Sequence, residues 1–312
     1  MSLVKRQLPL WSILVFSGVL SACAASTTAT TIATTPMAST STRPPPSDTT
    51  STSTTVTTTT TTTTEELPRC RPSPFTERFA AELTADYRGI TITAHVHDLR
   101  SNCGYSLNGD NRQITASVFK VMVMAGTLLE AQNEARPITE REMGLMLPMI
   151  TESANAPVRS LWRSFGASPW FREQGDAFGL RETRVTGDDG SAWGGTRTSA
   201  LDQVNLLRQV LVGDWGPLEP EYRAVALDLM TSVIPEQAWG VTAGVPANWI
   251  VAHKNGFAGR TINSVGWVDE PGPSNGYVVA ILTRGWSNHA AGIAAVERIN
   301  EVIAKTMTKT TG

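Results

Sequence analysis

The chain has 312 residues and a formal net charge of −2, with 26 lysines and arginines against 28 aspartates and glutamates. This balance gives no electrostatic reason to expect nucleic acid or an anionic lipid surface as a partner. The composition changes sharply along the chain, because residues 24–66 are almost entirely Thr, Ser, Ala and Pro, and an ordinary globular composition follows.

Residues 1–22 are typical of an export signal. Two basic residues precede an apolar run from Leu8 to Leu20, which is too short to span a membrane permanently. The run ends in Leu20-Ser21-Ala22-Cys23, which resembles the lipobox of bacterial lipoproteins. The resemblance implies cleavage before Cys23, a diacylglyceryl anchor on its sulfur, and a domain held at the extracytoplasmic side of the cell membrane. An ordinary secretory signal is the alternative, and it also implies export.

Residues 23–66 are predicted to form a disordered stalk, because they contain too few apolar residues to offset the entropy lost on ordering. Residues 67–312 are long enough for one folded domain, which we expect to be a monomer. If Cys23 carries lipid, Cys70 and Cys103 remain as a pair in an oxidising compartment. A disulfide between them is expected, and two free thiols are the alternative.

Hydrophobic spacing predicts the elements of this domain in chain order. The helix expected over Ser117–Ala131 is apolar nearly all round, which is typical of a helix buried in a core. The other expected helices cover Pro74–Tyr87, Met143–Ile150, Ala156–Phe165, Thr198–Val212, Glu221–Ser232 and residues 293–303. The expected strands cover Ile90–Leu99, a short segment before a turn at Asn108-Gly109-Asp110, Trp249–Lys254, Thr261–Val268 and Gly276–Thr283. Strands from both chain ends around a helical middle predict an α+β fold, with a sheet closed by both ends and packed against helices.

Three short motifs carry the chemistry: Ser117-Val118-Phe119-Lys120, Ser153-Ala154-Asn155 and Lys254-Asn255-Gly256. A serine and a lysine three residues apart on a helix share a face, so the Lys120 amine can reach the Ser117 hydroxyl. Apolar neighbours would desolvate Lys120, which favours its neutral form and makes it a usable base.

The other two motifs have structural alternatives. Ser153 and Asn155 precede a predicted helix, where both residue types are ordinary N-caps. Lys254 ends an apolar strand, where a lysine is unusual unless its amine functions in a binding pocket. The alternative is an ordinary lysine at a solvated strand end. Gly256 would let a bound chain approach the strand backbone.

With Phe257-Ala258-Gly259 completing a Lys-x-Gly-x-x-Gly pattern, the motifs resemble the three signatures of the penicillin-recognising serine hydrolases. The order of predicted elements is most similar to class A β-lactamases, and the resemblance covers about Pro74–Met307. It implies an antiparallel sheet packed against helices, a helical lobe, and a site in the cleft between them.

The resemblance also implies a role for each matching residue. Ser117 would be acylated, Lys120 would be its base, and Ser153 would relay the proton. Lys254 would orient Ser153 and a substrate carboxylate. The backbone N–H groups of Ser117 and Phe257 would form the oxyanion hole. The residues expected to bind the substrate are Asn155, Asn255, Gly256 and Phe257.

The chain departs from class A enzymes where they position the deacylating water. Between Gly179 and Thr198 no Glu-x-x-Leu-Asn is present, and Glu182, Asp188 and Asp189 are the candidate replacements. A missing general base slows a step by about 10²- to 10⁴-fold, so slow release of a β-lactam is expected.

Three further departures concern the substrate side. Asn255 occupies the place of a small hydroxyl residue, and Ala154 that of an aspartate. Ser153 follows Ser117 by only 36 residues, which predicts a shortened helical lobe.

Metal and cofactor chemistry is not indicated. His95 and His97 alternate on a predicted strand, but no third ligand cluster lies near them in the sequence, which favours two ordinary histidines on one sheet face. No Gly-rich phosphate loop or dinucleotide fingerprint follows a strand, so we expect no cofactor.

Two functions of different classes remain open. The first is a lipid-anchored serine hydrolase or acyltransferase of the cell envelope, acting on an amide or ester such as a peptidoglycan peptide. The second is a catalytically degenerate relative that serves as a binding or scaffold module on a stalk.

Overall fold

The computed structural model describes residues 69–186, 193–213, 216–272 and 276–309. These residues belong to the second of two compact units, Thr63–Gly312. The predicted signal peptide, the predicted stalk and the expected lipidation site Cys23 lie outside the described residues, as do the candidate bases Asp188 and Asp189. None of the described helices combines the length and the apolar character that crossing a membrane requires.

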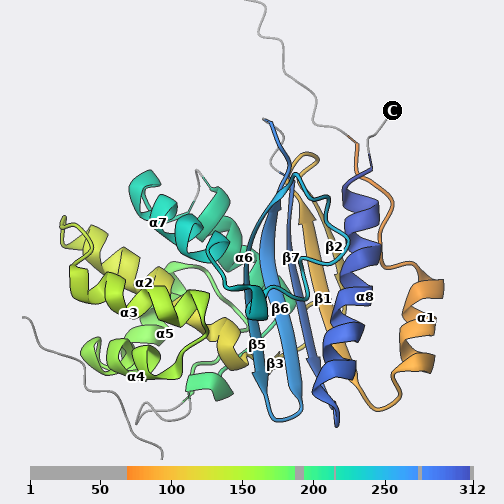
Figure 1. The fold of residues 1–312 in the computed structure, drawn as a ribbon, viewed down its shortest axis with the longest axis horizontal. Coiled ribbons are helices and arrows are strands. Elements are labelled where there is room, and N and C mark those ends of the chain that lie inside the picture. Colours follow the sequence, from red (N-terminus) through yellow and green to blue (C-terminus); the bar gives the residue numbers. More distant parts are fainter. Residues whose placement is uncertain (1–68, 187–192, 214–215, 273–275, 310–312) are drawn as a thin grey trace, which may run out of the picture. The chain divides into compact units, whose positions relative to one another are not determined.

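In the described part of the chain, five strands form one antiparallel sheet in the order β2-β1-β7-β6-β5 (Figure 1). They are β1 (Thr91–Asp98), β2 (Cys103–Leu107), β5 (Ile250–Ala258), β6 (Thr261–Asp269) and β7 (Tyr277–Arg284). The central strand β7 pairs with β1 on one side and with β6 on the other. The sheet is therefore closed by both ends of the domain, as the sequence predicted.

Both faces of the sheet are buried. In β7, Val278, Ala280 and Leu282 pack into the core on one face, whereas Val279 and Ile281 pack into the core on the other. Alternate side chains of a strand point to opposite faces, so a strand covered on both faces is apolar throughout. Helices α1 (Glu77–Asp86) and α8 (His289–Met307) lie together beside one face, as Figure 1 shows.

A group of helices occupies the other side of the sheet (Figure 1). It comprises α2 (Phe119–Asn133), α3 (Glu140–Thr151), α4 (Asn155–Ser164), α5 (Ser168–Ala177), α6 (Ala200–Leu207) and α7 (Pro220–Thr231). Helix α2 is buried along nearly its whole length, which its all-round apolar sequence requires. Helix α5 was not predicted, because its sequence is rich in polar residues and only a few side chains, such as Phe171, reach the core.

Several shorter elements complete the described chain. They are the two-stranded pair β3 (Gln113–Ile114) and β4 (Arg197–Thr198), the 3-10 turns η1 (Ala116–Val118), η2 (Trp193–Gly195) and η4 (Pro235–Gln237), and the π-helical segment η3 (Arg208–Val212). The helix predicted over Ser117–Ala131 starts two residues too early. Residues 116–118 form the 3-10 turn η1, and the α-helix begins only at Phe119. The strand predicted to end at Lys254 continues to Ala258, because residues 255–258 keep pairing with β6.

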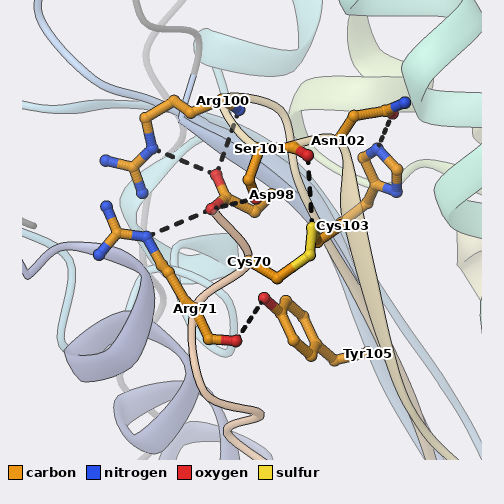
Figure 2. The surroundings of a disulfide bond; sticks show 9 residues. Cys70, Arg71, Asp98, Arg100, Ser101, Asn102, Cys103 and Tyr105 are labelled. Atoms are coloured by element: carbon orange, nitrogen blue, oxygen red, sulfur yellow. Dashed lines mark hydrogen bonds and ion pairs between the residues drawn. A yellow bond between two sulfur atoms is a disulfide. The ribbon is translucent and has the colours of Figure 1, made fainter. Parts of the chain in front are cut away.

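A disulfide joins the start of the described domain to the outer strand of the sheet. Cys70 lies before α1 and Cys103 opens β2, with their Cα atoms 5.7 Å apart (Figure 2). Tyr105 of the same strand adds a hydrogen bond of 2.7 Å from its hydroxyl to the carbonyl of Arg71. The segment that enters the domain is therefore fastened to the sheet covalently and by hydrogen bonding.

A buried carboxylate reinforces the same corner. Asp98 accepts hydrogen bonds from Arg71 Nε at 3.2 Å, Arg100 Nε at 3.2 Å and Ser101 Oγ at 2.9 Å (Figure 2). The two arginines also donate to backbone carbonyls at the end of α8 and just beyond it. Because the charge of Asp98 is paired and hydrogen-bonded, its burial is tolerated, and the two ends of the domain are held together.

Replacement of both Cys70 and Cys103 by serine is expected to lower the free energy of unfolding by about 2–4 kcal/mol, because the bond closes a loop in the unfolded chain. Urea unfolding of the oxidised proteins measures the difference. Reductant should shift the wild-type midpoint and leave the double variant unchanged. Equal midpoints for the two oxidised proteins would contradict the prediction.

Candidate active site

Ser117 lies in the turn η1, at the junction between β3 and α2, and is partly exposed. The preceding residue, Ala116, has a φ of 47°, in the left-handed region that non-glycine residues rarely adopt. Strand β5 passes directly against this turn at Gly256, where a Cβ atom would stand 2.9 Å from the backbone nitrogens of Ser117 and Val118. Glycine is therefore required at residue 256 for the strand and the turn that carries Ser117, the candidate nucleophile, to touch.

Lys120 lies one turn further along α2, with its side chain fully buried. Its Nζ atom is 3.0 Å from Ser117 Oγ, 3.1 Å from Ser153 Oγ and 2.9 Å from Asn155 Oδ1, and it also bonds to the carbonyl of Ser153. Burial lowers the pKa of Lys120 to about 7, so that a large fraction of this amine is neutral at physiological pH.

Trp193 contributes to the burial of this amine. Its ring centroid lies 5.4 Å from Lys120 Nζ, and the ring stacks on Phe119 at a centroid distance of 6.2 Å. The sequence did not assign Trp193 to this position, because 73 residues separate it from Lys120 and only the fold brings the two together.

Lys254 approaches Ser153 from β5. Its Nζ atom is 2.9 Å from Ser153 Oγ and 3.0 Å from the carbonyl of Asn255. Burial, and secondarily the charge of Lys120, lowers the pKa of Lys254 to about 7. Ser153, which has a φ of 62°, therefore lies between two buried amines.

No carboxylate forms an ion pair with either lysine in the described part of the chain. Two adjacent amines in a desolvated site oppose each other's protonation, and their titration belongs to the pair. The hydrogen bonds run without a break from Ser117 through Lys120 and Ser153 to Lys254. This set of groups can accept the proton of the serine hydroxyl and pass a proton onward.

The two expected substrate-binding asparagines are placed differently. Asn155 is exposed at the first residue of α4, where its side chain accepts the hydrogen bond from Lys120. Asn255 is 2% exposed. Its amide donates to the carbonyls of Gln237 and Trp239 at 2.7 and 2.9 Å, and its Oδ1 accepts from Ser264. This corrects the expectation that Asn255 borders the substrate, because every polar atom of its side chain is engaged within the protein.

Phe257 lies two residues further along β5 than Asn255 and is 55% exposed. Its ring meets that of His289 edge to face at a centroid distance of 4.6 Å, and Trp239 lies 6.4 Å from the same histidine. The sequence pointed only to the backbone of Phe257. His289 opens α8 and Trp239 follows η4, so no local pattern connects them with the strand.

Glu182, a candidate for the missing deacylating base, lies outside this group. Its carboxylate pairs with Arg112 at 2.5 Å, and both side chains are partly exposed to solvent. Its backbone N–H donates to the buried Asp202. The ion pair and the surface position explain why Glu182 makes no contact with Ser117 or Lys120.

His95 and His97 bond within the sheet region, to Ser106 Oγ at 2.6 Å and to Asn102 Oδ1 at 2.9 Å. Among the described residues, no three side chains of His, Cys, Asp or Glu gather in a way that could hold a metal ion.

The comparisons with known proteins agree with this architecture. A sequence profile described as the Beta-lactamase enzyme family matches residues 144–307, a segment that includes Ser153 and Lys254 and begins after Ser117 and Lys120. No curated protein matches the chain in sequence.

Solved structures show the same fold. PBP-A, as a mutant in an acyl-enzyme complex with penicillin G, is 20% identical with a TM-score of 0.64, covering 73% of this chain and 94% of its own. A β-lactamase from Xanthomonas campestris pv. campestris is 20% identical with a TM-score of 0.65, covering 73% and 95%. An ancestral Gram-negative β-lactamase of class A, as a double mutant, is 19% identical with a TM-score of 0.66, covering 73% of this chain and 97% of its own. With more than half of its length matched by the family profile, and with a fold like that of class A β-lactamases, the chain belongs to the Beta-lactamase enzyme family.

Proposed function

We propose that the protein is a cell-envelope serine hydrolase or acyltransferase that forms an acyl-enzyme on Ser117. The observation that carries the proposal is the 3.0 Å contact between Ser117 Oγ and the Nζ atom of the buried Lys120. A neutral amine in hydrogen-bond reach of a hydroxyl is the arrangement that a serine nucleophile needs.

The chemistry follows from the hydrogen bonds. Ser117 Oγ bonds to the acyl carbon, the electron pair of the C=O double bond moves to its oxygen, and the hydroxyl proton passes to Lys120. When the tetrahedral intermediate collapses, the C=O double bond re-forms and the bond to the leaving nitrogen or oxygen breaks. The leaving group takes the proton from Lys120 through Ser153. Backbone N–H groups of Ser117 and Phe257 would stabilise the oxyanion.

A peptide of the cell wall is the substrate that this site supports best. Strand β5 is an edge strand of the described sheet, and an edge can pair with an extended peptide. Asn155, exposed beside Lys120, would hold a substrate amide. Because Glu182 is paired elsewhere and the chain carries no Glu-x-x-Leu-Asn, we propose that β-lactams acylate the enzyme and leave it slowly.

We also propose that the domain is anchored to the cell membrane through a lipid on Cys23, with residues 24–66 as its tether. The support is the sequence Leu20-Ser21-Ala22-Cys23 at the end of an export signal. An enzyme held in this way could reach wall material within a tether length of the membrane.

Incubation of the purified protein with penicillin G should give one stoichiometric adduct in intact-mass analysis. Ser117→Ala should abolish the adduct, because the hydroxyl oxygen that would carry the acyl group is gone. Ser287→Ala, which removes an exposed serine outside the site, should acylate like the wild type.

The time course of the same experiment separates the remaining alternatives. A wild type that forms no adduct with penicillins and turns over no ester would be a binding or scaffold module. An adduct that is lost within seconds in the wild type, but persists in the double variant Asp188→Asn and Asp189→Asn, would show that these residues supply the deacylating base.

The acylation rate should rise with pH through about 7 and then level off, because the lysine pair must lose a proton before Ser117 can be deprotonated. Lys120→Arg should remove this rise together with most of the activity, since a guanidinium stays charged. Stopped-flow acylation between about pH 5 and about pH 9 measures the profile, and a flat profile would refute the role of the lysines.

Protein stability, like the acylation rate, should rise with pH. The unfolded chain, with a lysine pKa of 10.5, binds more protons than the folded chain between about pH 7 and 10.5. The free energy of unfolding should therefore increase with pH across this interval.

Cys23→Ser should move the protein expressed in a bacterial host from the membrane fraction to the soluble fraction, because the sulfur that carries the lipid is removed. The double variant Cys70→Ser and Cys103→Ser should stay with the membrane. Metabolic labelling with a palmitate analogue, followed by fractionation, makes the comparison; membrane retention of Cys23→Ser would contradict the anchor.

A further inference from the structure

Asn263 of β6 is a completely buried polar residue next to the site, and no step proposed above uses it. In the antiparallel register it faces Gly256 of β5, the residue that touches the nucleophile-bearing turn. Its Nδ2 atom donates to the carbonyls of Ile114 and Thr115, at 2.7 and 3.0 Å. Its Oδ1 atom accepts from the N–H of Thr283 at 3.0 Å.

The two carbonyls belong to the residues that lead into η1. Ile114 ends β3, and Thr115 also accepts a hydrogen bond from Val118 N at 3.3 Å, which closes the turn around Ser117. The Asn263 amide therefore holds the entrance of the turn, two and three residues before the nucleophile. A buried side chain with three hydrogen bonds has little freedom to shift.

The support of Asn263 is itself rigid. Thr283 lies on the central strand β7, its hydroxyl donates to the carbonyl of Ile262, and it accepts a hydrogen bond of 2.7 Å from Trp286 Nε1. The connected hydrogen bonds thus extend from the middle of the sheet to the residues before Ser117.

The oxyanion hole needs such a connection because its two donors come from separate elements. One N–H belongs to Ser117 in η1 and the other to Phe257 in β5. Asn263 is linked to both elements, through strand pairing with Gly256 and through its side chain with Ile114 and Thr115. An error of about 1 Å in such positions can cost about 100-fold in rate.

We propose that Asn263 is a positioning residue that sets the spacing of the oxyanion hole by fixing η1 against β5. This inference rests on the proposed acylation of Ser117. Asn263 does not touch the substrate, so it acts through the backbone of residues 114–117.

A matched control exists in the same domain. Asn300 of α8 is also fully buried, and its Nδ2 atom also donates to two backbone carbonyls, those of Val241 and Ala243, at 2.9 and 2.8 Å. These carbonyls lie outside the nucleophile-bearing turn. Asn263→Ala and Asn300→Ala therefore remove the same kind of interaction, and only the first removes it beside Ser117.

The full chain, solubilised in detergent, is compared as wild type, Asn263→Ala and Asn300→Ala. The concentration dependence of penicillin G acylation separates the dissociation constant of the initial complex from the first-order rate of acylation. Thermal unfolding gives the loss of stability, and hydrogen exchange of a peptide covering residues 113–119 reports on the turn without any need for activity. Should Asn263→Ala not fold, Asn263→Asp keeps the volume and the acceptor for Thr283 and loses the donors.

Asn263→Ala should slow acylation by about 100-fold, change the dissociation constant by less than about threefold, and speed exchange in residues 113–119. Asn300→Ala should lower the unfolding temperature and leave both the acylation rate and this exchange unchanged. Equal slowing in the two variants, or unchanged exchange in Asn263→Ala, would overturn the proposal. If the wild type is not acylated, the proposed function fails, and the exchange result alone decides whether Asn263 positions the turn.

Discussion

The burial of the Lys120 amine beside Ser117, with no carboxylate partner in the described part of the chain, is the constraint on which the rest of the site depends. An amine in this environment loses solvation, so its neutral form is favoured. That environment requires a helix apolar on all sides, an aromatic ring at Trp193, and a sheet behind them. The charge of Lys120 in turn adds to burial in lowering the pKa of the second buried amine, Lys254. Protein stability is lost to keep the amines neutral near pH 7, as is common where a buried group has to react.

The candidate site also lies where two parts of the fold meet, the helical group and the edge of the sheet. Ser117 and Lys120 come from the beginning of the helical group, whereas Lys254, Gly256 and Phe257 come from the edge of the sheet. Backbone contact at Gly256 brings the parts together, and the side chain of Asn263 holds them there. The geometry of the candidate site therefore depends on hydrogen bonds within the core as well as on the more exposed residues around Ser117.

The central motif residues of the candidate site match the family's signatures more closely than the residues around them do. Ser117, Lys120, Ser153 and Lys254 form one hydrogen-bonded set. In contrast, Asn255 is turned into the protein, and an exposed aromatic residue, Phe257, follows on the strand. The surroundings of the candidate site therefore differ from the family's signatures more than its central hydrogen-bonded residues do.

The sequence by itself determined the features that depend on local periodicity. The Ser117–Lys120 spacing places both side chains on one side of a turn, the all-round apolar character of α2 requires burial, and the distribution of strands predicts a sheet closed by both ends. Only the tertiary structure decided which side chains meet across the chain. The pairing of Glu182 with Arg112, the inward orientation of Asn255 and the bond from Asn263 to Ile114, 149 residues apart, have no local signature. The physical reason is that periodicity specifies which face of an element is buried, whereas the partner on that face is set by how the elements pack.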